Sequence, residues 1–342
     1  MSDGAPLLEV RNLKKYYPLS QGLFKRKAGT VKAVDDVSFT IQPGETFGLV
    51  GESGCGKSTI AKSVIRAVEP TDGDVIFHLD RPRNLAKLNR EELKVARRHI
   101  QLVFQDPFSS LNPRHRVRDI IGEPLKVNNV ADGKELEDQV GHLMSSVGLR
   151  PEYQVRYPHA FSGGQRQRIG IARALAMHPK LIICDEPVSA LDVSVQAQIL
   201  NLLSDLQSEF GLTYLFVSHD LGVVQHISDR VAVMYVGRLV ETGPTRKLFE
   251  APQHPYTAAL LSASPKPHPR FRRTQPVLTG EVPDPLSAPS GCHFHPRCPY
   301  RQQVCEEEFP PLEPVPDSPG QFVACHFASE IELEGVPAVT PR

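Results

Sequence analysis

No part of this chain of 342 residues is a long hydrophobic run. A helix that crosses a bilayer needs about 18 or more apolar residues in succession, and no segment approaches that length. The N-terminal residues also lack the apolar core and the small-residue cleavage site of a secretory signal peptide. We therefore expect a chain without membrane spans of its own that resides in the cytoplasm.

The chain also lacks an excess of either charge, with 39 Lys and Arg residues against 39 Asp and Glu residues. Proteins dedicated to nucleic-acid binding usually carry a strongly basic surface. Balanced totals leave room for a local basic patch, but nucleic acid is not expected as a partner.

Cysteine is scarce, and four of the six cysteines lie near the C-terminal end. Cys55 and Cys184 fall inside other motifs, where the cytosol would keep them reduced. The remaining four, separated by five, six and nineteen residues, are Cys292, Cys298, Cys305 and Cys325. These separations match neither the spacing of common zinc modules nor the compact ferredoxin pattern. From the residues alone, zinc, an iron–sulfur cluster and free thiols all stay open, and three histidines could add zinc ligands: His293, His295 and His326.

A chain of 342 residues exceeds the size at which a single hydrophobic core usually stops growing. Prolines become frequent beyond about Glu250, which predicts an irregular, strand-poor segment rather than a continuation of a sheet. We place a domain boundary near Pro265. The expected organisation is one domain over residues 1–265 and a C-terminal extension over residues 266–342.

Residues 7–50 alternate apolar and polar side chains, which predicts strands of a sheet with one solvent-facing side. Three later runs are typical of buried strands: residues 100–104, 181–184 and 213–217. Buried strands separated by helical segments predict a parallel sheet with helices on its faces. Between the first and second of these runs the strand signal disappears, so we expect an inserted helical lobe over about 106–178. A further helix is predicted over 193–210, with Asp192 at its N-cap and Gly211 after its end.

A glycine-rich motif occupies residues 51–58, with the sequence GESGCGKS, between a predicted strand at 46–50 and a predicted helix from Lys57 to about Ala67. In this setting the glycines let backbone N–H groups surround phosphate oxygens at a helix N-terminus, where the helix dipole favours anions. The Lys57 ammonium can reach the terminal phosphates, and the Ser58 hydroxyl can coordinate Mg²⁺. The motif predicts a nucleotide site with a metal, formed by Gly51, Ser53, Gly54, Cys55, Gly56, Lys57, Ser58 and Thr59.

A second motif narrows the class of nucleotide-binding protein. The segment Phe161-Ser162-Gly163-Gly164-Gln165 precedes a helical stripe and differs by one apolar residue from the LSGGQ signature of ATP-binding-cassette proteins. Together with Gln105, the Leu181–Glu186 strand motif, Leu191-Asp192 and His219, the order and spacing resemble an ATP-binding-cassette ATPase over residues 7 to about 250. The resemblance implies an α/β nucleotide-binding domain with a RecA-like parallel sheet core, an antiparallel β subdomain and an inserted helical lobe. It also implies a head-to-tail dimer, in which two ATP molecules lie between the glycine motif of one subunit and the signature of the other.

The resemblance further assigns residue roles. Glu186 is expected to orient and deprotonate the attacking water, with Gln105 and His219 as further catalytic residues. The implied Mg²⁺ ligands are Ser58, Gln105 and Asp185. The implied nucleotide contacts outside the glycine motif are Tyr17, Ser162, Gly163, Gly164, Gln165 and Asp192. Tyr17 is the residue expected to stack on adenine, and Tyr16 is its competitor for that role.

The C-terminal part shows a narrower resemblance. The segment 254–261, HPYTAALL, and the Cys-rich tail resemble the extension of oligopeptide and dipeptide importer ATPases. Four cysteines hold a 4Fe–4S cluster in some members of that group, so the resemblance implies a cluster at Cys292, Cys298, Cys305 and Cys325. Residues 185–192 and an insertion at 22–27 look more like the second of the two paired ATPase subunits than the first.

The resemblance implies the partners as well: a paired homologous ATPase subunit, two integral membrane permease subunits and an extracytoplasmic peptide-binding protein. The expected location is peripheral, on the cytoplasmic face of the inner membrane. Two alternatives stay open. The first is the ATPase of a nickel or glutathione importer, because these importers have similar ATPases. The second is a soluble cassette protein that acts on ribosomes or DNA, but such proteins usually carry two cassettes in one chain and this chain has one.

Overall fold

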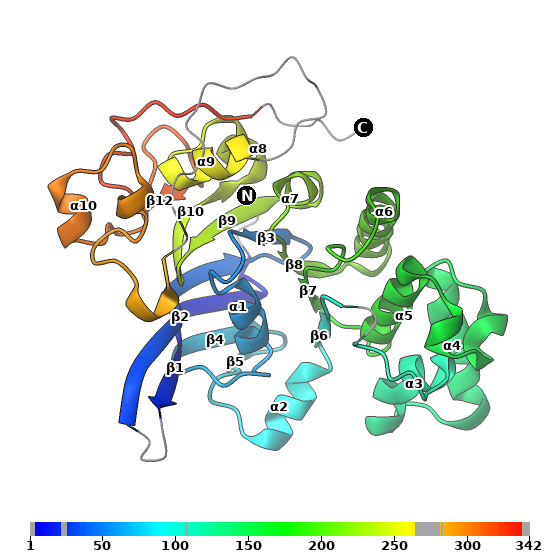
Figure 1. The fold of residues 1–342 in the computed structure, drawn as a ribbon. Coiled ribbons are helices and arrows are strands. Elements are labelled where there is room, and N and C mark those ends of the chain that lie inside the picture. Colours follow the sequence, from blue (N-terminus) through cyan, green and yellow to red (C-terminus); the bar gives the residue numbers. More distant parts are fainter. Residues whose placement is uncertain (1–3, 22–25, 107–108, 264–280, 282, 337–342) are drawn as a thin grey trace. The chain divides into compact units, whose positions relative to one another are not determined.

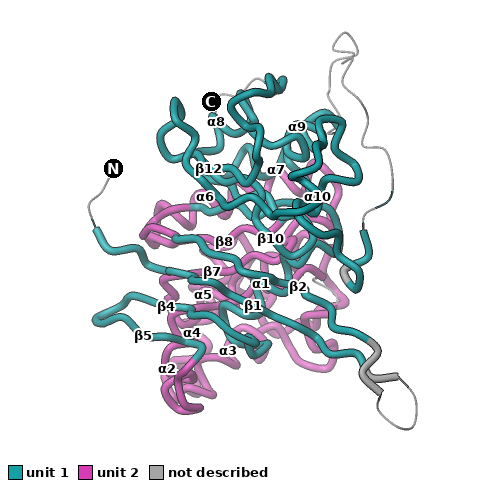
Figure 2. The backbone as a smooth tube through the Cα atoms, turned by 90° about the vertical axis from the view of Figure 1, so that its left-hand side faces the viewer, with its two compact units in different colours: residues 1–40, 46–86, 218–342 teal, residues 41–45, 87–217 magenta. Residues whose placement is uncertain are grey.

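The computed structural model describes residues 4–21, 26–106, 109–263, 281 and 283–336, and Figure 1 labels their helices and strands. The chain divides into two compact units, coloured separately in Figure 2. Unit 1 contains residues 1–40, 46–86 and 218–342, and unit 2 contains residues 41–45 and 87–217. The predicted boundary at Pro265 and residues 22–25 of the predicted insertion lie outside the described residues.

A four-stranded sheet belongs to the N-terminal part of the chain. Its strand order is β2-β1-β4-β5, for β1 (Leu8–Gln21), β2 (Arg26–Ile41), β4 (Asp72–His78) and β5 (Pro82–Asn84). β4 pairs antiparallel with both β1 and β5. Val75 and Phe77 of β4 are buried while their neighbours are more exposed, as expected for a sheet with one wet face. The alternating pattern correctly predicted strands in this part of the chain, and the antiparallel pairing of β4 agrees with the β subdomain that the resemblance implies.

Unit 1 also holds a run of five strands in the order β11-β12-β10-β9-β3. Their bounds are β3 (Thr46–Val50), β9 (Arg230–Tyr235), β10 (Arg238–Pro244), β11 (Glu313–Pro314) and β12 (Phe322–Val323). β3 is buried throughout and pairs parallel with β9, whereas β10 runs antiparallel to β9 and to β12. The tail thus adds short strands to a sheet, which the abundance of proline did not predict.

The helices of unit 1 are short. They are α1 (Lys57–Val64), α7 (Leu221–Ile227), α8 (Thr245–Glu250), α9 (Pro255–Ala263) and α10 (Gln303–Glu307), with 3₁₀ turns η3 (Pro285–Ser287) and η4 (His295–Arg297). α1 ends at Val64 rather than near Ala67, because Arg66 adopts a left-handed conformation with φ 55°. The N–H of Ala67 then donates to the carbonyl of Lys62 at 2.8 Å. Within the described part of the chain, no helix has the length and apolar character needed to cross a membrane.

Unit 2 has three parallel strands and most of the longer helices. The strands are β6 (Ile100–Val103), β7 (Leu181–Asp185) and β8 (Thr213–Val217), and β7 pairs with both of the others. The helices are α2 (Arg90–Arg97), α3 (Val117–Val127), α4 (Gly133–Ser146), α5 (Gly163–Leu175) and α6 (Val193–Phe210), with 3₁₀ turns η1 (Pro151–Val155) and η2 (Pro158–Ala160). The described residues between β6 and β7 contain helices and turns but no strand, in line with the expected helical segment.

α6 matches its predicted bounds at both ends. Asp192 occupies the N-cap position, although its side chain makes no capping hydrogen bond. Gly211 follows the helix with φ 62°, the left-handed conformation that commonly ends helices at glycine.

A buried carboxylate connects the last strands of unit 1 to the tail. Glu241 of β10 is fully buried and accepts hydrogen bonds from the backbone N–H groups of Gln253 at 2.9 Å and His254 at 3.0 Å. The side-chain amide of Gln321 donates to it at 2.8 Å. These donors stabilise the charged carboxylate and lower its pKa, but burial disfavours the charged form more strongly. The net effect raises the pKa of Glu241 to about 7.

The stability of the protein should depend on pH through Glu241. Because folding raises its pKa from 4.5 to about 7, the native state holds a proton that the unfolded state releases in this window. The contribution of this group to stability is complete below about pH 4.5 and is lost as the pH rises toward about 7. We expect the Tm of the Glu241→Gln variant to fall less than that of the wild type over this interval, as measured by thermal scans. The exposed Glu250→Gln variant is the control, and parallel curves for all three proteins would refute this assignment.

Candidate functional site

The glycine-rich motif forms the predicted loop between β3 and α1. β3 ends at Val50, the loop covers residues 51–56, and α1 begins at Lys57. Lys57 is 4 % exposed, and its ammonium donates to the carbonyls of Gly51 at 2.8 Å and Glu52 at 2.9 Å. The loop therefore curls around the lysine, as a phosphate cradle requires. Ser58 and Thr59 occupy the first turn of α1, and the exposed Ser53 and Gly54 lie at the tip of the loop.

Contacts from elsewhere in unit 1 require glycine at two loop positions. A Cβ at Gly51 would lie 2.2 Å from the carbonyl oxygen of Met234, and one at Gly56 would lie 2.0 Å from that of Ala33. Both glycines also have positive φ, 154° and 112°, which side chains rarely adopt. The path of the loop is thus fixed by backbone groups of β2 and β9.

Glu52 has partners that the sequence analysis did not find. Its backbone N–H donates to the hydroxyl of Tyr256 at 2.9 Å. Its carboxylate accepts two hydrogen bonds from the guanidinium of Arg297, at 2.8 and 3.2 Å. Arg297 stands 245 positions away in the sequence, so no local pattern could have identified it.

The two candidate adenine-stacking tyrosines of β1 differ in their surroundings. The Tyr16 hydroxyl hydrogen-bonds to Asp35, and burial together with this bond raises the pKa of Tyr16 to about 12. Tyr17 is 36 % exposed, and the Lys15 ammonium lies 4.8 Å from the centre of its ring. The Tyr16 hydroxyl is therefore engaged by a neighbouring residue, whereas Tyr17 is partly exposed.

The predicted catalytic carboxylates follow a buried strand of unit 2. Asp185 is the last residue of β7 and is 4 % exposed. Glu186 comes next with φ 49°, an uncommon conformation for a residue with a side chain, and its N–H donates to the carbonyl of Val217 at 2.9 Å. The Gln105 amide donates to the Glu186 carboxylate at 2.8 Å. The structure thus brings together two of the three predicted catalytic residues.

The signature segment forms the N-terminus of α5. Ser162 is the N-cap, and its hydroxyl accepts from the N–H of Gln165 while the Gln165 side chain accepts from the N–H of Ser162, which is a capping box. A Cβ at Gly164 would lie 2.5 Å from a methyl carbon of Val195, so this glycine allows α5 to approach α6. Ser162 is exposed and Gly163 is partly exposed, so the first turn of the helix is accessible to a ligand.

His219 and Asp192 lie at exposed positions beside helix starts. Asp192 precedes α6. His219 precedes Asp220, whose carboxylate caps α7 by accepting from the N–H groups of Gly222 and Val223. Both residues are exposed.

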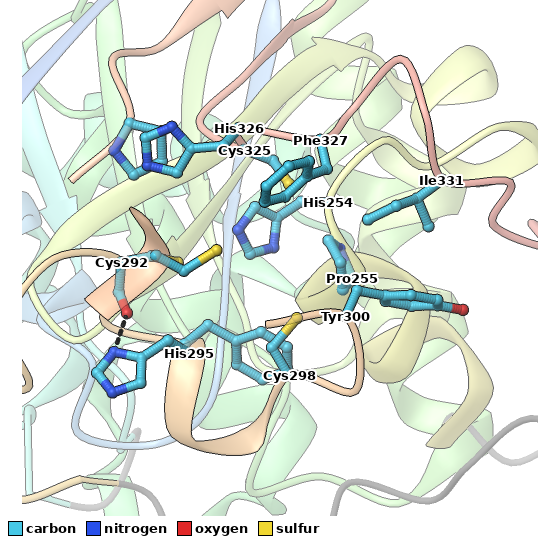
Figure 3. A pocket seen from close by; sticks show the side chains of 13 residues that line it. His254, Pro255, Cys292, His295, Cys298, Tyr300, Cys325, His326, Phe327 and Ile331 are labelled. Atoms are coloured by element: carbon cyan, nitrogen blue, oxygen red, sulfur yellow. Dashed lines mark hydrogen bonds between the residues drawn. The ribbon is translucent and has the colours of Figure 1, made fainter. Parts of the chain in front are cut away.

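The four C-terminal cysteines line one cavity of unit 1, with an empty volume of about 330 Å³ including its mouth. The sulfur atoms of Cys292, Cys298 and Cys325 face this space in Figure 3. Histidines at 254, 295 and 326 also line it. Of the histidines named as possible zinc ligands, His293 does not line this cavity, and its Nδ1 lies 3.0 Å from the carbonyl oxygen of Val236.

Burial disfavours the thiolate form of three cysteines in this cavity. Burial raises the pKa of Cys292 to about 12 and that of Cys325 to about 11, and it also raises the pKa of Cys298. Among the described residues, no three or more His, Cys, Asp or Glu side chains are arranged closely enough to hold a metal ion. The expected iron–sulfur cluster and the alternative zinc ion are therefore not confirmed.

Two family models match the chain. The ABC transporter model matches residues 34–189, which include the glycine loop, the signature and both carboxylates. The model for the oligopeptide/dipeptide transporter C-terminal region matches residues 240–305, which include Tyr256, Arg297 and three of the cavity cysteines.

Similar proteins cover nearly the whole chain. The oligopeptide transport ATP-binding protein AppF of Bacillus subtilis is 53 % identical, with 94 % of this chain and 98 % of the relative aligned. The dipeptide transport ATP-binding protein DppF of Escherichia coli is 48 % identical, with 96 % of each chain aligned. Among solved structures, the dimeric post-hydrolysis state of the ATP-binding cassette MJ0796 bound to ADP and Pi is 29 % identical, with a TM-score of 0.61 over 70 % of this chain and 99 % of that one.

These relationships and the α/β nucleotide-binding fold with a mixed sheet define the class: the chain belongs to the ABC transporter ATP-binding proteins. Within that class its relatives are named as ATP-binding proteins of peptide transport systems.

Gly56→Ala should disrupt the loop. The added methyl group would meet the Ala33 carbonyl oxygen at 2.0 Å, so the backbone there would have to shift. It would also place a side chain in a left-handed conformation, which by itself costs about 1–3 kcal/mol. We expect a clearly lowered Tm in thermal scans. Gly170→Ala in α5 is the matched control, because nothing lies within 4 Å of its added Cβ, and it should leave Tm unchanged or raise it slightly. Equal Tm values for the two variants would contradict the tight packing around Gly56.

Proposed function

We propose that this chain is the ATP-binding and ATP-hydrolysing subunit that powers import of dipeptides or oligopeptides through a membrane permease. The observation that carries this proposal is the identity of 48–53 % over nearly full length with proteins named for peptide transport. The match of residues 240–305 to the C-terminal region of oligopeptide/dipeptide transporters supports the same cargo class.

The phosphate end of ATP is assigned to the glycine loop. Loop N–H groups would surround the phosphate oxygens, and the Lys57 ammonium would exchange its two carbonyl partners for the terminal phosphates. Tyr17, whose ring is partly exposed, would stack on the adenine. Mg²⁺, which neutralises phosphate charge, prefers oxygen ligands, and the donors assigned to it are the Ser58 hydroxyl, the Gln105 amide oxygen and the Asp185 carboxylate.

Glu186 is assigned as the base. The Gln105 amide and the backbone bond from Glu186 to Val217 hold its carboxylate in place, so the carboxylate can orient a water and accept its proton. His219 is assigned to the γ-phosphate. Catalysis of phosphoryl transfer depends chiefly on positioning of the reactants and stabilisation of charge, and Glu186, Gln105 and His219 would supply these.

The partners follow from the same assignment. The accessible start of α5 with Ser162, Gly163, Gly164 and Gln165, and the exposed Asp192, would bind the ATP held by a paired homologous ATPase subunit. Two permease subunits and an extracytoplasmic binding protein would complete the importer. The chain would then work at the cytoplasmic face of the membrane.

Glu186→Gln tests the catalytic assignment. The amide keeps the size of the side chain and cannot accept the proton, so we expect MgATP to bind with near wild-type Kd while turnover falls by about 10²-fold or more. Peptide uptake by the assembled transporter, measured with a labelled dipeptide, should stop as well. The control is Glu209→Gln on the exposed side of α6.

Two results would overturn the proposal in different ways. Near wild-type hydrolysis by Glu186→Gln would show that Glu186 is not the base. Uptake of nickel or glutathione but not of peptides would leave the ATPase in place and replace its cargo.

We also propose that Cys292, Cys298, Cys305 and Cys325 hold a 4Fe–4S cluster. The support is that all four line one cavity and that four cysteines are the usual ligand set of such a cluster. Ligation would require the raised thiol pKa values to fall on metal binding.

Anaerobic purification tests the cluster. We expect broad visible absorption and about four irons per chain, and Cys298→Ser should lower both. The Cys184→Ser variant serves as the control, because Cys184 is buried in β7 and is not among the residues that line this cavity. Stoichiometric zinc, or no metal, would contradict the cluster.

A further inference from the structure

Arg297 forms a forked ion pair with the glycine loop. Two of its guanidinium nitrogens donate to the two carboxylate oxygens of Glu52, at 2.8 and 3.2 Å. The Arg297 side chain is 5 % exposed and that of Glu52 is 22 % exposed, so water screens the pair only weakly. A paired geometry of this kind fixes direction as well as distance.

Aromatic packing holds Arg297 in place. It ends the turn η4, and the preceding Phe294 is 1 % exposed. The Phe294 ring lies 5.4 Å from the rings of Tyr235 in β9 and Tyr256 in α9, and these three residues form an aromatic cluster. The guanidinium of Arg297 also donates to the Tyr235 hydroxyl at 3.2 Å. The arginine therefore has little freedom to move away from Glu52.

The aromatic cluster also contacts the backbone of the glycine loop. Tyr256, which is fully buried, accepts the hydrogen bond from the Glu52 N–H, and the Glu52 carbonyl accepts from the Lys57 ammonium at 2.9 Å. Glu52 is thus held at its side chain, its N–H and its carbonyl. A shift of Arg297 would therefore move Glu52 and, with it, the backbone of the loop whose N–H groups we assign to the phosphates.

The turn that carries Arg297 lies between two of the cavity cysteines. Cys292 and Cys298 bracket Phe294 and Arg297, and the N–H of Cys292 donates to the carbonyl of Cys305 at 2.8 Å. The backbone that shapes the cysteine cavity therefore also places the arginine.

We propose that Arg297 is a positioning residue of the nucleotide site: it holds the phosphate loop through Glu52 and so couples the C-terminal segment to ATP binding. This inference rests on the proposed function as an ATP-binding subunit. Coupling between two sites is reciprocal. A ligand or contact that displaces the turn at Arg297 would lower the affinity for nucleotide by a certain factor, and bound nucleotide would lower the affinity for that ligand or contact by the same factor.

The test measures MgATP affinity and steady-state ATPase kinetics of the full chain. Arg297→Gln and Glu52→Gln should each raise the Kd and KM for MgATP by about tenfold, within the range typical of coupled sites, with kcat changed less than twofold. Arg297→Lys, which keeps the charge without the fork, should fall between Arg297→Gln and the wild type. The double variant Arg297→Gln/Glu52→Gln should be no weaker than either single variant, because both remove the same interaction.

Two control variants separate the possible failures. Arg246→Gln, which removes an exposed arginine paired with Glu250, should bind MgATP as the wild type does. Lys57→Ala should lose binding in every background. If Lys57→Ala loses binding while all Arg297 and Glu52 variants keep wild-type Kd and KM, the positioning role is refuted and the proposed function stands. A lowered Tm without any change in Kd or KM refutes it as well, and absence of MgATP binding by the wild type refutes the proposed function itself.

Discussion

The turn from β3 into α1 is held by close backbone approaches, and the rest of the nucleotide site depends on it. Carbonyl oxygens of Met234 and Ala33 occupy the space that side chains would need at Gly51 and Gly56. The loop between these two points has little freedom, and its carbonyls surround the Lys57 ammonium. A cradle set in advance in this way does not have to be ordered by the nucleotide, so less binding energy is spent on ordering it.

Glu186 shows a second constraint of the same kind. Its left-handed φ of 49° is costly for a residue with a side chain, and a backbone bond to Val217 maintains it. The conformation turns the chain sharply after the buried strand β7, where Gln105 meets the carboxylate at 2.8 Å. The strain lies at the residue to which we assign the base, which is where structures commonly tolerate it.

The sequence predicted the parts of the fold that local patterns control. β3, β8 and α6 have their predicted bounds, because continuous apolar runs, an N-cap residue and a closing glycine are local signals. α1 ends early because Arg66 leaves the helical region, and the nearest helix-breaking residue in the sequence, Pro70, comes four positions later. The pairing of β12 with β10 was missed, since a two-residue strand in a proline-rich segment is defined by its neighbour rather than by its own residues. The phosphate loop could be read from one motif, whereas Arg297 could not, because only tertiary structure brings it to Glu52.

The tail also forms the edge of the sheet that contains β3, β9 and β10. β12 pairs with β10 at Glu241 and Thr242, and the strand beyond it, β11, consists of only Glu313 and Pro314. A proline has no N–H to offer, and a charged side chain discourages the approach of another strand. This border therefore offers an incoming chain almost no main-chain template for edge-to-edge aggregation.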